Sequence, residues 1–318
     1  MVDGRDRPAR VANVGVIGDR ITYIGVEQPA ATSRLDASGL IVAPGFIDAH
    51  SHLVQRLDED PSVAELSLFQ GITTIVGGAD GELDPIEIDR LHDFFDKHEL
   101  AINIAFLVGH DATRQALPSA GDEKARQLLL ERIREGLQLG ALGVVRSANG
   151  RATAAGGRSE EVELTRMAQA VGAFYVVGMA NSISVRFPWE GDRSSQHDVT
   201  GHAIHPHPAD AAQFSRVMSR YVAQLQLITM PAAIHQMSLA TADRIGLVAR
   251  GRVSRGRIAD LLVLDPAMVR DRATPREPSK RAEGVRHLLV NGVLVVRDGQ
   301  RTDARPGRIL TRKQHAGR

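Results

Sequence analysis

The feature that most constrains the fold is an alternation in the middle of the chain, where short apolar runs are followed by segments of helical periodicity. This alternation is typical of βα units and of a mainly parallel sheet. The expected strands are residues 41–43 with 45–47, then 73–76, 102–108, 142–145 and 174–177. Such a series of βα units predicts an α/β fold, either a barrel or a doubly wound sheet.

Helix signals follow most of these strands. Asp84 before Pro85 predicts a helix start, with an N-cap residue and a proline at the first helical position. Apolar residues at spacings of three and four predict buried helix faces. These faces are Ile88, Leu91 and Phe95; Leu129, Ile133 and Leu137; and Leu164, Met167 and Val171 before Gly172. Further helices are expected near residues 214–225 and 231–240.

Both chain ends are rich in β-strand signals. Gly18-Asp19 separates two apolar runs near the start, and Asn291-Gly292 separates two near the end. Asn and Gly tolerate the positive φ angles of a type I′ hairpin turn. We therefore expect a small β domain built from residues 1–43 and 245–318, around a larger domain at residues 44–244.

Composition excludes several classes of site. The chain has 318 residues, no cysteine and a formal net charge of +1. Any metal must therefore be held by His, Asp or Glu, and no disulfide or thiolate nucleophile is available. The arginines are spread along the chain, so no nucleic-acid partner is expected. No apolar segment resembles a signal peptide or a membrane span, which favours the cytoplasm and no membrane contact.

The sharpest local feature is a His-x-His pair, His50 and His52, directly after an apolar run. In an extended segment, residues i and i+2 point to the same side, so both imidazoles can reach one metal ion at the end of a strand. A His-x-His pair alone is weak support, since surface or hydrogen-bonded histidines are common. The residues that precede the pair, Pro44-Gly45-Phe46-Ile47-Asp48, make the metal interpretation much stronger.

This segment resembles the first-strand signature of the metal-dependent amidohydrolase superfamily. Residues 256–265 look like the return of the same superfamily into its β-sandwich, and residues 290–299 with 305–310 are similar to the C-terminal end of N-acyl-D-amino-acid deacylases. The resemblance implies a (β/α)8 barrel with its site at the C-terminal strand ends. It also implies a β-sandwich formed by both chain ends.

The activity implied by the resemblance is hydrolysis of the linear amide of an N-acyl-D-amino acid. Zinc or another divalent metal would activate a water, and the products would be a carboxylate and a D-amino acid. Asp80 falls where this subgroup has a metal-bridging cysteine, and an oxygen ligand there should weaken the preference for zinc over manganese or magnesium. Asp198 falls at the catalytic aspartate that transfers the proton. Each could instead be an ordinary carboxylate in a turn or loop.

The chain also departs from this family. Gly178 and Ala180 stand where the family has a metal-binding histidine and a substrate-side arginine, and residues 182–197 replace a much longer segment. Residues 46–240 fall short of the roughly 200 residues of a complete barrel. We therefore expect an incomplete barrel with uncovered strand edges, and either a homo-oligomer or an unstable monomer.

Three functions remain open from the sequence. The first is a working deacylase that uses His50, His52, Asp80 and Asp198. The second is an inactive, degenerate amidohydrolase that acts as a binding or scaffold protein. The third, a cyclic amidase with a carboxylated lysine, is disfavoured because no lysine lies between Lys124 and Lys280. His110 matches a Gly-His of the family and is expected to be hydrogen-bonded at a loop end.

Overall fold

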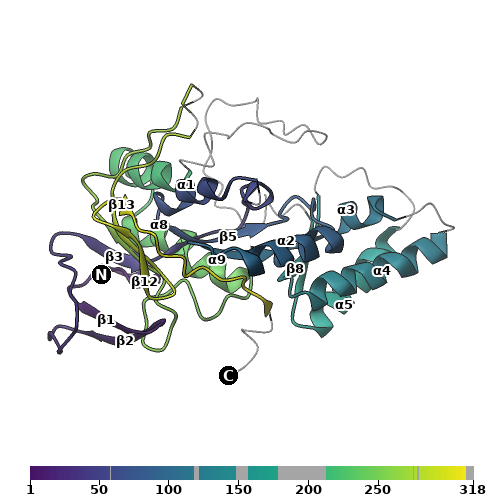
Figure 1. Ribbon diagram of the computed structural model, residues 1–318, viewed down its shortest axis with the longest axis horizontal. Coiled ribbons are helices and arrows are strands. Elements are labelled where there is room, and N and C mark those ends of the chain that lie inside the picture. The colour runs from purple at the N-terminus through teal and green to yellow at the C-terminus, as the bar shows by residue number, and fades with distance from the viewer. Residues whose placement is uncertain are drawn as a thin grey trace.

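The computed structural model describes residues 1–57, 59–117, 122–147, 157–177, 213–274, 276–277 and 279–312. Strands from the two chain ends lie together at one end of the molecule, and three long helices extend from its middle to the other end (Figure 1). These helices are α2 (Pro85–Lys97), α4 (Asp122–Gln138) and α5 (Gly157–Ala170). Parallel strands run between the two ends.

The parallel strands form two three-stranded sheets, in the orders β4-β5-β6 and β7-β8-β9. Their bounds are β4 Phe46–Asp48, β5 Ile72–Gly77, β6 Asn103–Phe106, β7 Val108–Gly109, β8 Gly143–Arg146 and β9 Phe174–Val177. The expected strand at residues 102–108 is interrupted at Leu107, because the segment changes partner there. The Leu107 amide donates to Gly77, while the carbonyl of Phe106 accepts from Leu142. One extended segment thus joins the two sheets.

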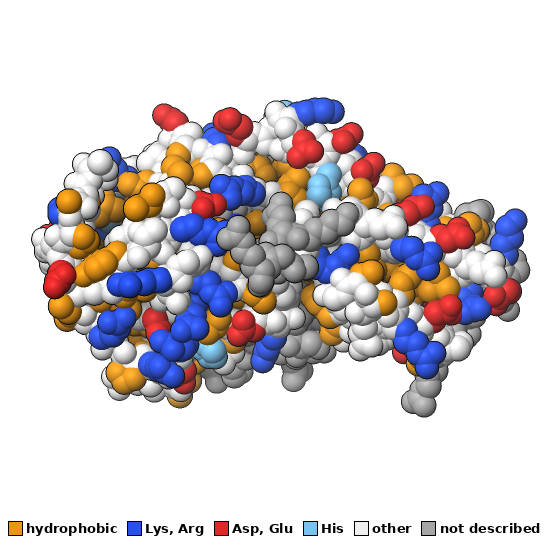
Figure 2. Space-filling view, turned by 90° about the horizontal axis from the view of Figure 1, so that it is seen from below, with side chains coloured by type: hydrophobic (Ala, Val, Ile, Leu, Met, Phe, Trp, Pro, Cys, Tyr) orange, Lys and Arg blue, Asp and Glu red, His pale blue; other side chains and the backbone are white. Residues whose placement is uncertain are grey.

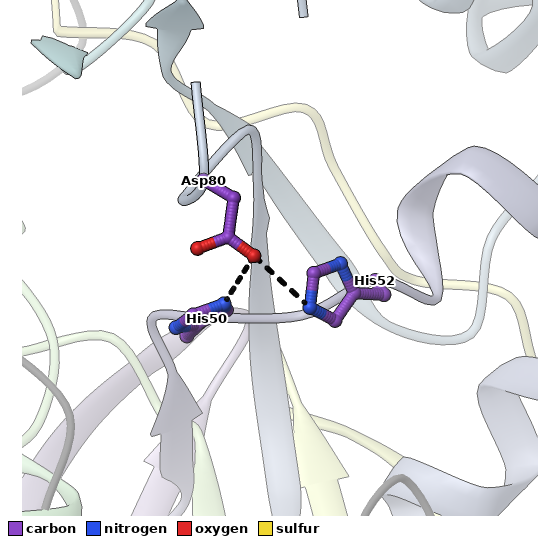
Figure 3. A group of neighbouring side chains, drawn as sticks. All are labelled: His50, His52 and Asp80. Atoms are coloured by element: carbon purple, nitrogen blue, oxygen red, sulfur yellow. Dashed lines mark hydrogen bonds and ion pairs between the residues drawn. The ribbon is translucent and has the colours of Figure 1, made fainter. Parts of the chain in front are cut away.

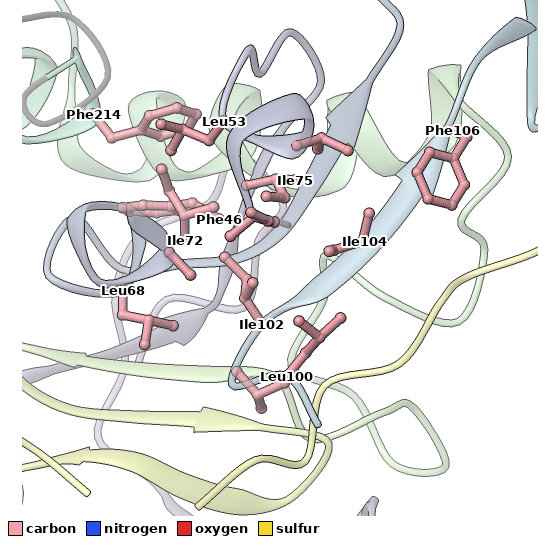
Figure 4. Close-up of a cluster of buried hydrophobic side chains, with 14 of the residues drawn as sticks. Phe46, Leu53, Leu68, Ile72, Ile75, Leu100, Ile102, Ile104, Phe106 and Phe214 are labelled. Atoms are coloured by element: carbon pink, nitrogen blue, oxygen red, sulfur yellow. The ribbon is translucent and has the colours of Figure 1, made fainter. Parts of the chain in front are cut away.

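The two faces of these strands pack against different elements. One face contributes Ile75, Ile104, Phe106, Val108 and Val144 to the main core, together with apolar residues of α2, α4 and α5. Figure 4 shows Ile75, Ile104 and Phe106 within this core, near Phe46 and Phe214, whose rings stack with centroids 5.8 Å apart. The opposite face contributes Ile47, Val76, Ala105, Leu107 and Val145 to a second cluster. Ala242 of α9 (Leu239–Arg244) covers that second face.

Most of the expected helix signals are confirmed. Asp84 caps α2, because its side chain accepts a hydrogen bond from the Glu87 amide at 2.8 Å. The predicted inner faces of α2 and α4 are buried. Val171 is the exception, with 45% of its surface exposed. Helix α5 ends at Ala170 and Gly172 turns the chain at φ 71°, so Ala168 takes the buried position instead.

Shorter helical segments complete the described chain. They are η1 Val54–Arg56, η2 Pro61–Val63, α1 Ala64–Leu68, α3 His110–Gln115, the π-helix η3 Val217–Gln224 and α8 Met230–Met237. None of the helices in the described ranges combines the length and the apolar character needed to cross a bilayer. Acidic and basic side chains alternate over the end of the molecule that carries α4 and α5 (Figure 2). Helix α4 carries ion pairs one turn apart, such as Arg126 with Glu123.

Strands from both chain ends form one antiparallel sheet in the order β13-β12-β11-β10-β3. Their bounds are β3 Ile41–Pro44, β10 Leu261–Leu264, β11 Val285–Val290, β12 Val293–Arg297 and β13 Gln300–Arg301. The predicted turn is confirmed, since Asn291 and Gly292 have φ angles of 49° and 82°. Strands β1 (Asn13–Ile17) and β2 (Arg20–Gly25) form the expected N-terminal hairpin. The domain boundaries at residues 43 and 244 remain predictions.

The C-terminal segment, residues 307–312, lies between the two parallel sheets. The Ile104 amide donates to Arg308 and the Ile104 carbonyl accepts from Leu310, so the segment pairs with the free edge of β6. The Arg312 amide then donates to Gly140, just after α4. The last described residues of the chain therefore fill the gap where β6 and β8 separate.

A buried polar network connects the antiparallel sheet to the parallel strands. Asp260 precedes β10, accepts from the Arg250 guanidinium, and accepts from the Asn291 amide at 2.7 Å. The Asn291 side chain accepts from Arg250 at 2.8 Å and donates to Asn103 of β6 at 2.7 Å. All four residues are at most 4% exposed. Buried charges require such partners, because an unpaired one is strongly destabilising.

This network generates a stability prediction. Asp260→Asn keeps the side-chain shape but leaves the Arg250 charge without a buried counter-charge. We expect the free energy of unfolding, measured by urea denaturation, to fall by about 3–5 kcal/mol. Asp243→Asn, at an exposed position of α9, is the control and should change it by less than about 0.5 kcal/mol. Equal effects of the two substitutions would contradict the assigned role of Asp260.

Candidate metal centre

His50 and His52 lie just beyond the C-terminal end of β4. The strand ends at Asp48, close to the expected end at residue 47, and both histidines follow it as expected. The Asp48 side chain accepts from the His50 amide at 3.0 Å, and the amide of the buried Ser51 donates to Val76 at 3.0 Å. These contacts hold the backbone beside β5, and the two imidazole centroids lie 5.1 Å apart.

Asp80 reaches the histidines through a glycine turn after β5. Gly78 has a φ of 90°, and a Cβ atom there would lie 2.2 Å from the carbonyl oxygen of Leu107. Only glycine therefore fits at this position without displacing the neighbouring strand segment. The Gly81 amide then donates to the Gly78 carbonyl, which closes the turn and directs Asp80 toward the end of β4.

The three side chains converge on one point (Figure 3). Oδ2 of Asp80 lies 3.2 Å from Nε2 of His50 and 3.5 Å from Nε2 of His52. Ligand atoms bound tetrahedrally to zinc at its usual bond lengths are roughly 3.4 Å apart. One ligand atom from each residue lies within 4.8 Å of the others, so the donor set fits a divalent metal ion.

The electrostatics of the group favour a cation. Burial disfavours the charged form of His50, but the hydrogen bond to Asp80 and the charges of Asp80, Asp48 and Glu82 outweigh it and raise the pKa of His50. The carboxylates thus create a negative potential at the two imidazoles. A metal ion at that position would balance the negative charge of the carboxylates, and His50 could then remain neutral and bind the metal.

Glu82 belongs to the same group of side chains, although the sequence did not point to it. Its Oε2 accepts from the Asp80 amide at 2.8 Å, and its Oε1 accepts from Gln55 Nε2 at 2.9 Å. The same Oε1 lies 3.9 Å from Nδ1 of His52. The only available signal was its position two residues after Asp80, which is too weak to identify a functional carboxylate.

A second buried cluster lies at the C-terminal end of β7. His110 is 7% exposed, and its Nε2 lies 2.8 Å from Glu160, which also pairs with Arg114. Nδ1 of His110 lies 3.1 Å from the Tyr175 hydroxyl. The Glu160 carboxylate, paired with Arg114, can only accept, so Nε2–H of a neutral His110 donates to it and Nδ1 is left to accept from the Tyr175 hydroxyl. Burial raises the pKa of Tyr175 to about 12. The expected hydrogen bonding of His110 is confirmed, but the residue begins helix α3 directly after β7 and does not end a loop. Its partner Glu160 was not anticipated.

The structure therefore brings together three of the four predicted site residues. His50, His52 and Asp80 meet at the C-terminal ends of β4 and β5. Asp198, the predicted proton-transfer residue, lies outside the described residues, as do Gly178 and Ala180.

Comparison with known proteins identifies a matching family and curated relatives that align with nearly the whole chain. The model of the amidohydrolase family matches residues 34–203. D-aminoacylase of Alcaligenes xylosoxydans xylosoxydans is 26% identical and the N-acyl-D-glutamate deacylase of the same organism 27% identical. The first alignment covers 98% of this chain and 96% of the relative, and the second covers 98% and 95%. The first spans 469 positions against 318 residues here, in agreement with the expected shortening.

The fold is shared with a solved structure of this kind. N-acyl-D-glutamate deacylase from Bordetella bronchiseptica, in complex with zinc and a phosphonate inhibitor, superimposes with a TM-score of 0.76. The two chains are 24% identical, and the match covers 98% of this chain and 97% of the other. The expected barrel-type α/β fold is therefore confirmed. Among the described residues its parallel strands are those of the two three-stranded sheets.

The buried state of His110 predicts how stability depends on pH. Burial, reinforced by the charges of Arg114 and Arg146 and opposed by Asp111, lowers the pKa of His110 from 6.5 to about 4. Between about pH 6.5 and pH 4, the imidazole of His110 is protonated in the unfolded chain but stays neutral in the folded chain. The free energy of unfolding is therefore unaffected by this group above pH 6.5, and it decreases as the pH falls, by up to roughly 3 kcal/mol.

Denaturation between pH 7.5 and 4.5 measures this effect. His110→Gln removes the titrating group, so the stability of the wild type should fall more steeply with acidification than that of the variant. The exposed His98→Gln variant is the matched control and should follow the wild type. Parallel curves for the wild type and His110→Gln would contradict the prediction.

Proposed function

The chain belongs to the amidohydrolase family, and from this membership we propose that it is a metal-dependent hydrolase of N-acyl-D-amino acids. The observation that carries the proposal is the convergence of His50, His52 and Asp80 at the C-terminal ends of β4 and β5. Barrel enzymes place their active sites at this end of the strands. The substrate class is supported by the relatives, whose names specify D-aminoacylase and N-acyl-D-glutamate deacylase activity.

His50, His52 and Asp80 would hold one divalent cation, zinc or another metal that accepts two nitrogens and an oxygen. When bound, the cation supplies Lewis-acid chemistry, which makes water a nucleophile near neutral pH and polarises the amide carbonyl. Because thiolates are absent, the oxygen of Asp80 should make the site less selective for zinc over manganese than a cysteine-containing site.

The proposed role of Asp198 is to move one proton. Hydrolysis adds the oxygen of water to the carbonyl carbon and breaks the carbon–nitrogen bond. A carboxylate at Asp198 would accept the proton that the water releases and transfer it to the leaving nitrogen. The immediate products are then a carboxylic acid and a D-amino acid with a neutral amino group. The acid releases its proton near neutral pH and the amino group takes one up, which leaves a carboxylate and a D-amino acid.

Metal analysis together with an assay on N-acetyl-D-methionine and N-acetyl-D-glutamate tests the proposal. The purified protein should contain about one divalent metal ion per chain. It should release a D-amino acid, whereas the L-enantiomers should remain intact. His52→Asn should lose metal and activity together, because two ligands rarely retain the ion. His98→Gln, at an exposed histidine, should keep both.

Asp198→Asn separates binding from proton transfer. The variant should keep its metal but lose about 10²–10⁴-fold in kcat, which is the usual contribution of a general acid or base. A metal-free wild-type chain that releases no D-amino acid would refute the hydrolase and favour the inactive, scaffold-type alternative.

A homo-oligomer remains a prediction, as does the cytoplasmic compartment. The homo-oligomer is supported by the edge of β9. Within the described ranges this strand pairs only with β8, and it ends in Val177, whose exposed fraction is 47%. An apolar strand edge of this kind favours pairing with another surface. Light scattering should give a mass above that of one 34.4 kDa chain. A monomer that melts cooperatively would contradict the prediction.

A further inference from the structure

The geometry of the metal centre leaves one nitrogen of His52 turned away from the ligand position. Nε2 of His52 lies 3.5 Å from Asp80, on the side where the three ligand atoms converge. Nδ1 lies on the other side of the ring, 3.9 Å from Oε1 of Glu82. This separation is longer than a hydrogen bond and becomes one when the two groups approach by about 1 Å. A metal-binding histidine commonly donates its second ring N–H to a carboxylate, which fixes both the tautomer and the ring orientation.

Glu82 is itself held in place from two directions. Gln55 of η1 donates to Oε1, the oxygen that faces His52, at 2.9 Å. The Asp80 amide donates to Oε2 at 2.8 Å. The side chain is 28% exposed, so it remains partly open to solvent while lying close to both ligands.

We propose that Glu82 is a positioning residue of the metal centre, which orients the His52 ring through Nδ1 and anchors the Asp80 turn through its backbone amide. This inference rests on the proposed metal-dependent function and extends it to a residue that binds no metal itself. One carboxylate thereby connects two of the three ligands, which come from different strand ends. His52 and Asp80 would each lose less conformational freedom when the metal binds, because Glu82 already restrains both.

The charge of Glu82 has a separate effect. A carboxylate beside Nδ1–H makes the lone pair of Nε2 a stronger ligand for a cation, whereas a neutral amide at the same place has only a weak effect. Glu82→Gln keeps an oxygen that can accept from the Asp80 amide but removes this charge. The variant therefore distinguishes an electrostatic and orienting role toward His52 from a purely structural role in the loop.

Competition with a chromophoric chelator measures the zinc affinity of the full chain. Glu82→Gln should bind zinc about 10- to 100-fold more weakly than the wild type, the usual cost of losing such a partner. Glu59→Gln, at an exposed carboxylate near η1, is the matched control and should bind as the wild type does. The melting temperature of the metal-free chain should be the same for all three proteins, because the loop contacts of residue 82 persist.

A second variant covers the case in which Glu82→Gln perturbs the loop and lowers the melting temperature. Gln55→Ala releases Oε1 without changing the charge, and it should weaken zinc binding by less than Glu82→Gln does. Zinc affinity of Glu82→Gln within twofold of the wild type overturns the inference and leaves the hydrolase proposal standing. A wild-type chain that binds no divalent metal overturns both.

Discussion

The buried contact between Asp260 and Arg250 is the interaction on which the arrangement of the chain depends. It lies where the antiparallel sheet meets β6, and Asn291 and Asn103 extend it from one sheet to the other. Apolar packing alone would allow the two sheets to slide, whereas a charge buried at 4% exposure must keep its partners in fixed positions. The strand ends that carry the metal ligands are therefore held relative to a sheet built from both chain ends.

The ligands themselves depend on backbone geometry more than on packing. His50 and His52 follow β4, and the amide of Ser51 between them bonds to Val76 of β5. Asp80 returns to them only because Gly78 and Gly81 accept positive φ angles. Asp80 was identified through the family resemblance, whereas the His-x-His pair was visible in the sequence because its geometry is local. The strand positions and the Asn291-Gly292 turn were predictable for the same reason, since hydrophobic periodicity and turn chemistry are short-range signals.

The parts that could not be predicted depend on contacts between distant residues. Glu160 meets His110 across 50 residues of chain, and Glu82 meets Gln55 across 27. No spacing rule connects a carboxylate on one helix with a histidine at the end of a strand. The interruption at Leu107 was hidden because a change of hydrogen-bond partner leaves no mark on an apolar run, and Val171 was assigned to the core because periodicity does not show where a helix ends.

The C-terminal segment at residues 307–312 has a consequence for how the molecule is made. It pairs with Ile104 and Gly140, which leave the ribosome long before it does. During synthesis, one edge of β6 therefore stays unpaired while some 200 further residues are added to the chain. A nascent chain in that interval offers a strand edge to chaperones or to neighbouring chains, and premature termination near the end would leave that edge permanently uncovered.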